Sequence, residues 1–215
     1  MSFRKAVFLL AALAVATTAS AHAQFGVYGM FTADRLSNTA SSPLPLPPDS
    51  TDPAFERSNS VNPLGGTGGV YYDFKKLTHV TLAADVRGSI LTTKRGAYVN
   101  FNGPGARIYS VLGGVRAEFH PPIKVLKPYV QGSVGLGRSD YGLFVYMPPS
   151  TAPLPTKIYS NFEWQGLAGL DIKLLPIMDY RVIELGYGGL DPFGTYSHNY
   201  PIKQISMGFV FHLPY

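Results

Sequence analysis

Apolar and polar residues alternate with a period of two along most of the chain after Gln24. Successive side chains of a β-strand point to opposite faces, so this pattern predicts strands with one apolar and one polar face. The sequence shows no helical period after its first 23 residues, and the domain is therefore predicted to be all-β. Eight segments qualify as strands: Phe25–Asp34, Thr67–Phe74, Val80–Leu91, Arg107–Phe119, Tyr129–Ser139, Tyr159–Leu174, Tyr180–Gly188 and Lys203–Leu213.

The connections between these segments are alternately long and short. Short turns join three pairs of strands, at residues 75–79, 120–128 and 175–179. Long polar segments follow the first, third, fifth and seventh strands, at residues 35–66, 92–106, 140–158 and 189–202. Bacterial outer-membrane barrels have this layout, with short turns on the periplasmic side and long loops outside. We therefore predict an eight-stranded antiparallel up-and-down transmembrane β-barrel over residues 24–215, with both termini in the periplasm.

The distribution of charge over the two faces indicates which solvent the apolar face meets. In the third predicted strand, Val86 and Ile90 lie on one face, and Asp85 and Arg87 lie on the other. A soluble lipocalin-like barrel shows the same alternation with its apolar face inward. Its outer surface would then carry most of the charge, yet the polar faces here are rich in Gly and Ser and poor in Lys. Small residues suit a crowded interior, so the apolar faces are expected to contact lipid.

Composition excludes several other classes of protein. The 215 residues are 46% hydrophobic and 14% charged, yet no apolar run after the first 23 residues is long enough for a spanning helix. The sequence has no Cys, which excludes disulfide frameworks, thiolate metal sites and cysteine nucleophiles. The formal net charge of +5 comes without a Lys/Arg cluster, so nucleic acid is not expected as a partner.

Residues 1–23 have the features of a secretory signal peptide. Arg4 and Lys5 precede an apolar stretch, and Ala21-His22-Ala23 forms a small-x-small cleavage site. We expect cleavage before Gln24, export through the periplasm and localisation in the bacterial outer membrane.

The last predicted strand carries the most specific signal. Apolar residues occupy every second position up to the final aromatic residue: Met207, Phe209, Phe211, Leu213 and Tyr215. In this strand the chain resembles bacterial outer-membrane β-barrel proteins. The resemblance to the small OmpA/OmpX-like eight-stranded barrels also covers Pro128-Tyr129-Val130 and Phe162-Glu163-Trp164-Gln165-Gly166. It implies that the five alternating residues are an insertion signal for the outer-membrane assembly machinery. Tyr215 departs from the commoner terminal Phe, and Pro214 removes one backbone donor.

Charged residues on the polar faces are expected inside the barrel, where each must be paired or hydrogen-bonded. Counting positions along the strands places Arg116 and Glu184 toward the periplasmic half and Arg87 and Glu163 toward the outer half, and we predict these two ion pairs. The network is expected to be structural and not a path for protons or ions. Its six predicted members are Asp85, Arg87, Arg116, Glu118, Glu163 and Glu184.

Tyrosines lie mostly near the predicted strand ends, where a girdle would contact lipid headgroups. The residues expected in this girdle are Tyr28, Tyr71, Tyr72, Tyr109, Tyr129, Tyr159, Tyr180 and Tyr187.

The sequence gives little support for catalysis. Ser197 and His198 are adjacent in the fourth long segment, but neighbouring side chains in one loop seldom form a catalytic relay. The histidines lack metal-ligand spacing, and neither a metal nor another cofactor is expected. We predict a monomeric, non-enzymatic barrel with a structural or surface-interaction role, such as envelope integrity or adhesion. The alternatives are a lipid-modifying enzyme that edits lipid A and a narrow channel. Nothing in the sequence names a ligand for the loops.

Overall fold

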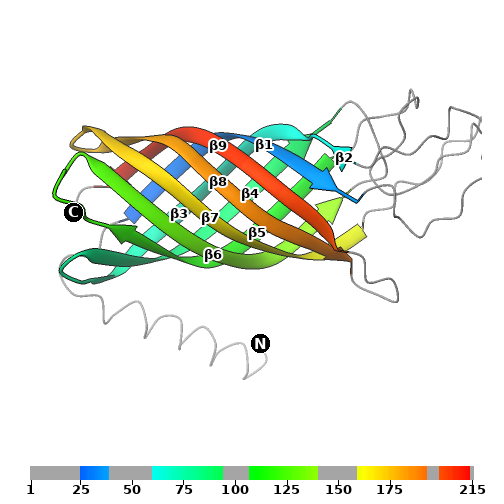
Figure 1. Cartoon of the computed structure of the whole chain (residues 1–215), viewed down its shortest axis with the longest axis horizontal. Coiled ribbons are helices and arrows are strands. Elements are labelled where there is room, and N and C mark those ends of the chain that lie inside the picture. The colour runs from blue at the N-terminus through cyan, green and yellow to red at the C-terminus, as the bar shows by residue number, and fades with distance from the viewer. Residues whose placement is uncertain (1–24, 39–59, 94–106, 140–158, 193–198, 214–215) are drawn as a thin grey trace, which may run out of the picture.

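The computed structural model describes residues 25–38, 60–93, 107–139, 159–192 and 199–213, which form a single antiparallel sheet (Figure 1). Its strands are β1 (Phe25–Ser37), β2 (Ser60–Val61), β3 (Leu64–Lys76), β4 (Val80–Thr92), β5 (Arg107–Phe119), β6 (Leu126–Ser139), β7 (Tyr159–Leu175), β8 (Met178–Pro192) and β9 (Tyr200–Leu213). Strand β1 pairs with β3 on one side and with β9 on the other, so the eight long strands close into a barrel. The predicted all-β, eight-stranded antiparallel fold is confirmed. Within the described segments, no helix is long and apolar enough to cross a membrane.

The two ends of the barrel differ. Short turns at residues 77–79, 120–125 and 176–177 join strands at one end, where β1 begins and β9 ends (Figure 1). We call this the turn end. The four longer connections leave from the opposite end, which we call the loop end.

The strands continue further toward the loop end than the alternation of side chains predicts. Strand β1 extends to Ser37, β3 already begins at Leu64, and β8 reaches Pro192. The predicted boundaries of the loops at 35–66 and 189–202 are therefore wrong by several residues. Backbone hydrogen bonds between strands need no apolar side chain, so pairing persists where the alternation fades.

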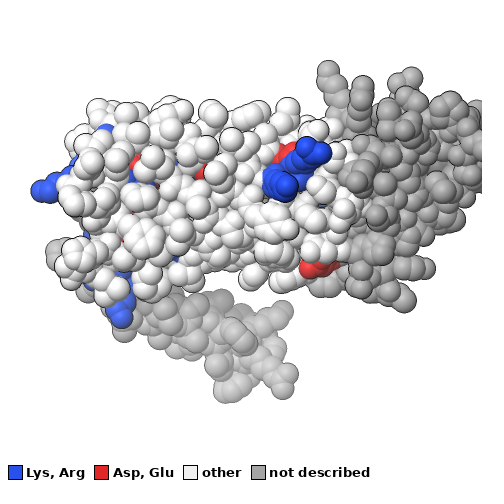
Figure 2. Space-filling model, in the orientation of Figure 1, with Lys and Arg blue, Asp and Glu red and all other residues white. Residues whose placement is uncertain are grey.

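The apolar face lies on the outside of the barrel. Val111, Val134 and Ile90 are 64%, 55% and 58% exposed, and Figure 2 shows few charged atoms over the central part of the visible wall. Among the described residues, the interior holds twenty buried polar or charged residues and fifteen buried hydrophobic ones. This distribution reverses that of a protein folded in water, where charged side chains are rarely buried.

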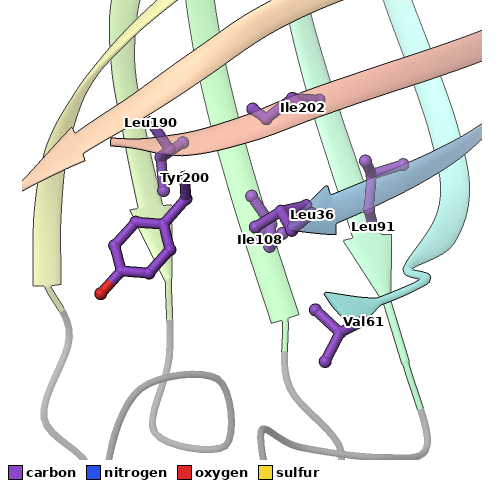
Figure 3. Packing of buried hydrophobic residues seen from close by; sticks show 7 residues of the cluster. All are labelled: Leu36, Val61, Leu91, Ile108, Leu190, Tyr200 and Ile202. Atoms are coloured by element: carbon purple, nitrogen blue, oxygen red, sulfur yellow. The ribbon is translucent and has the colours of Figure 1, made fainter. Parts of the chain in front are cut away.

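Apolar side chains nevertheless fill the interior at the loop end (Figure 3). This cluster, which we call the apolar cap, consists of Leu36, Val61, Leu91, Ile108, Leu190, Tyr200 and Ile202, each at most 4% exposed. The members come from six strands and meet across the barrel mouth. The alternation of side chains predicts a polar inward face and does not predict this cap.

Three tyrosines also point into the interior, each over a glycine on the neighbouring strand. Tyr129 lies opposite Gly169 on β7, and a Cβ atom at Gly169 would overlap the Tyr129 ring. The same relation holds for two pairs across β1 and β3, Tyr71 with Gly26 and Tyr28 with Gly69. Glycine thus provides the space that these rings occupy.

The predicted tyrosine girdle is therefore partly wrong. Tyr28, Tyr71 and Tyr129 are at most 3% exposed, because their position along the strand puts them on the inward face. Tyr109 and Tyr187 do face outward, at 38% and 53% exposure.

Replacing Gly169 by Ala is expected to lower the free energy of unfolding by about 1–3 kcal/mol, because the added methyl group overlaps the Tyr129 ring. Urea titration of the folded barrel, followed by tryptophan fluorescence, measures this change. Gly132→Ala on the adjacent strand is the matched control, since no atom lies within 4 Å of its Cβ position. Equal effects at the two positions would contradict the crowding of the interior.

Candidate functional site

Three arginines share two carboxylates in the middle of the barrel interior. Arg87 on β4 donates two hydrogen bonds to Glu184 on β8, at 3.0 and 3.2 Å. Arg181 binds Asp171 through a two-pronged contact of 2.8 and 3.1 Å and reaches Glu184 at 3.2 Å. Arg116 on β5 donates to Asp171 at 2.7 Å. Two of these contacts, Arg87–Glu184 and Arg116–Asp171, connect strands that are not neighbours in the sheet.

Asp85 provides a second carboxylate beside Arg87. Its carboxylate lies 3.4 Å from the Nε atom of Arg87. It also accepts hydrogen bonds from the Tyr28 hydroxyl at 2.9 Å and from the Gln131 amide at 2.7 Å. Three buried guanidinium groups thus meet three buried carboxylates, and Arg116 also binds the partly exposed Glu118, so each buried cation has an acidic partner.

Aromatic rings lie against the guanidinium groups. The Arg116 guanidinium lies 3.8 Å from the ring centroid of Tyr129. Arg181 lies 4.6 Å from the Tyr129 centroid and 4.8 Å from that of Tyr28. These distances are within the range of cation–π attraction.

All six ions predicted for the interior lie on the inward face, but they do not form the predicted pairs. Arg87 binds Glu184, whereas Arg116 binds Asp171 and, at 2.9 Å, Glu118. The predicted pairs Arg116–Glu184 and Arg87–Glu163 are therefore wrong. Counting along strands ignores their tilt in a barrel, so residues with equal counts lie at different heights.

Glu163 is held by neutral partners. Ser110 donates a hydrogen bond to it at 2.5 Å, and the Gln165 amide donates another at 2.7 Å. Its carboxylate and the Leu190 side chain both lie next to Gly137, so Glu163 adjoins the apolar cap. No Lys or Arg of the described segments forms an ion pair with Glu163.

Arg181 is the central residue that sequence reasoning missed. Arg181 lies two positions before Ile183, which faces outward. In a regular strand, side chains two positions apart lie on the same face, so Arg181 would also face outward. A β-bulge prevents this: Leu170 pairs with Ile183 and Asp171 pairs with Arg181, which leaves Val182 as an extra residue. Arg181 is consequently fully buried. The available signal was an arginine on an otherwise apolar strand face.

A second polar cluster lies at the turn end. Asp179 contacts Lys127 at 2.5 Å and His212 at 2.6 Å, and the Tyr71 hydroxyl lies 3.4 Å from the other ring nitrogen of His212. Within the described part of the chain, no group of three or more acidic or histidine side chains could hold a metal ion. Ser197 and His198 lie outside the described residues.

The interior leaves little room for a small molecule. A gap beside Arg87 is too narrow for a water molecule. Its lining consists of Thr67, Arg87, Ser89, Ser110, Leu112, Gln165 and Gln204. The arrangement can hold charges and rigidify the barrel.

The alternating residues of the last strand lie on the outer face of β9. Met207, Phe209, Phe211 and Leu213 are between 44% and 52% exposed. Tyr215, the fifth member of the predicted insertion signal, lies outside the described residues.

No family model and no curated protein matches the sequence. Solved structures do share the fold. Neisserial surface protein A superposes with a TM-score of 0.52 at 12% identity, over 89% of this chain and 97% of that chain. Ail of Yersinia pestis superposes with a TM-score of 0.48 at 14% identity, over 89% of this chain and 97% of that chain. The N-terminal barrel domain of Pseudomonas aeruginosa OprF superposes with a TM-score of 0.41 at 14% identity, over 89% of this chain and 100% of that chain. The chain thus has the fold of small eight-stranded outer-membrane barrels, and the predicted resemblance is confirmed at the level of the fold.

Replacing Arg181 by Met is expected to lower the free energy of unfolding by about 3–5 kcal/mol, because Asp171 and Glu184 would lose a shared buried counter-charge. Equilibrium denaturation of the folded barrel measures this loss. Arg138→Met removes an exposed arginine from the outer face of β6 and serves as the control. A loss at Arg181 no larger than at Arg138 would contradict the role of the network.

Proposed function

We propose that this chain is an integral protein of the bacterial outer membrane, with a closed barrel and a structural or surface-interaction role such as envelope integrity or adhesion. The observation that carries this proposal is the inverted distribution of polarity. A wall of exposed Val, Ile, Leu and Phe surrounds a buried ion network. In water such a wall would be strongly unfavourable, whereas lipid solvates it and leaves polar groups to be satisfied inside.

Strand length supports a membrane-spanning barrel. The eight long strands contain between 13 and 17 residues. A tilted strand needs about 9–11 residues to cross a bilayer. The surplus allows the wall to continue beyond the hydrocarbon layer toward the loops.

The filled interior favours a closed body over a narrow channel. The apolar cap occupies the barrel mouth at the loop end, and the ion network occupies the middle. Conductance in planar bilayers tests this point, and reproducible current that changes in Glu163→Gln or Arg87→Met would favour the channel.

We propose no catalytic activity, no cofactor and a monomeric state. A Ser197→Ala/His198→Ala variant is expected to leave the acylation pattern of lipid A unchanged in cells that produce it. A changed pattern would favour the lipid-modifying enzyme. Loop deletions tested for adhesion and for envelope sensitivity to detergents would identify the surface role.

We also propose that export follows cleavage before Gln24 and that the alternating face of β9 is the signal read by the assembly machinery. Removing Tyr215 should reduce the amount of folded barrel in the outer membrane, measured by fractionation and heat-modifiable gel mobility. An unchanged amount would contradict this assignment.

Replacing Val134 by Arg is expected to cost about 2–4 kcal/mol of stability in a bilayer, because the charge would face lipid near the middle of β6. Denaturant titration of the barrel folded into lipid vesicles gives the value. Leu174→Arg, at the turn end of β7, is the control and should cost about 0–1 kcal/mol because its charge can reach water. A neutral Val134→Arg variant would contradict the proposed membrane location.

A further inference from the structure

The outer wall carries a pair of cations near the loop end that the proposed function does not use. Arg35 on β1 and Lys203 on β9 are direct cross-strand partners, and both are exposed. Figure 2 shows Lys and Arg atoms gathered near the loop end, with Asp or Glu atoms beside them, whereas the central part of the visible wall carries few charged atoms. Like charges in directly opposed positions of a sheet repel each other. An arrangement of this kind is favourable when an anion lies between the two cations.

No acidic side chain of the described segments supplies that anion. Neither Arg35 nor Lys203 forms an ion pair with another described residue. Asp34, the neighbour of Arg35 in sequence, points into the barrel and is 7% exposed. An anion that binds this pair therefore comes from outside the described barrel.

The surroundings of the pair match a lipid headgroup. On its other side Lys203 lies opposite Tyr187, against which Trp164 packs edge-on with a centroid distance of 6.0 Å. Such aromatic side chains favour the interface between headgroups and hydrocarbon. Four register positions further toward the turn end, Phe31 and Met207 lie opposite each other and are 57% and 47% exposed. The wall thus changes from cationic to apolar over a few residues.

We propose that Arg35 and Lys203 bind the phosphate group of a lipid A-type glycolipid in the outer leaflet, with its acyl chains lying over Phe31 and Met207. The guanidinium group of Arg35 matches a phosphate through two parallel hydrogen bonds, and the Lys203 ammonium adds a point charge. The apolar wall beside the pair favours a phosphate that is attached to acyl chains over a free phosphate ion. This inference rests on the proposed outer-membrane location.

The test compares lipid binding by the full barrel in phosphatidylcholine nanodiscs. Bisphosphorylated lipid A is titrated, and its dissociation constant is measured by native mass spectrometry. Arg35→Gln/Lys203→Gln is expected to weaken binding about tenfold. Lys75→Gln/Lys76→Gln removes the same charge from the turn end and should leave the constant within about twofold.

Two further ligands separate the sources of the anion. Lipid A without phosphate groups should bind the wild-type barrel about as weakly as phosphorylated lipid A binds the double variant. Inorganic phosphate at millimolar concentration should not displace the lipid. The inference is overturned if the double variant binds like the wild type, if the turn-end variant loses as much affinity, if phosphate-free lipid A binds equally well, or if inorganic phosphate competes.

Folding controls keep this test separate from that of the proposed function. Heat-modifiable mobility and a strand-type circular dichroism spectrum in bilayers report whether each variant inserts. A barrel that inserts but does not discriminate between these lipids overturns the inference alone, whereas a wild-type chain that does not insert overturns the proposed function. If the double variant does not fold, the single variants Arg35→Gln and Lys203→Gln, each expected to weaken binding about threefold, provide the same comparison.

Discussion

A charge that faces the interior of an eight-stranded barrel has no water to reach, so its counter-charge must come from other interior side chains. In this chain Arg87, Arg116 and Arg181 meet the buried carboxylates of Asp85, Asp171 and Glu184 in an enclosed group. The contacts run between β4 and β8 and between β5 and β7, which do not pair in the sheet. The network therefore fixes the barrel across its interior, where backbone hydrogen bonds cannot.

The apolar cap and the ion network depend on each other. The cap closes the loop end with side chains such as Leu36 and Leu190, which are fully buried. Excluding water raises the strength of each ion pair below it, because the effective dielectric constant falls. The same exclusion makes any unpaired charge costly, which explains why Glu163, adjacent to the cap, is satisfied by Ser110 and Gln165.

Local pattern was sufficient to predict the strands and the outward face, because both follow from the period of two. It could not predict the ion pairs, since these depend on strand tilt and closure, which no single strand contains. The inward position of Arg181 could not be predicted for a related reason, because the bulge at Val182 is defined only by how β8 pairs with β7 and β9. The apolar cap was readable in part, because Leu91 and Ile108 fall on the inward face, but its closure required distant strands to meet.

The bulge in β8 also affects how the barrel tolerates changes in chain length. Removing one residue from a regular strand exchanges its two faces from that point onward, which would carry interior charges into lipid. Arg181 and Glu184 are three positions apart, yet both point inward, because Val182 has no partner on β7 or β9. Loss of Val182 would therefore leave a strictly alternating strand with both charges still inside. At this position the chain can shorten by one residue without exchanging its interior and exterior faces.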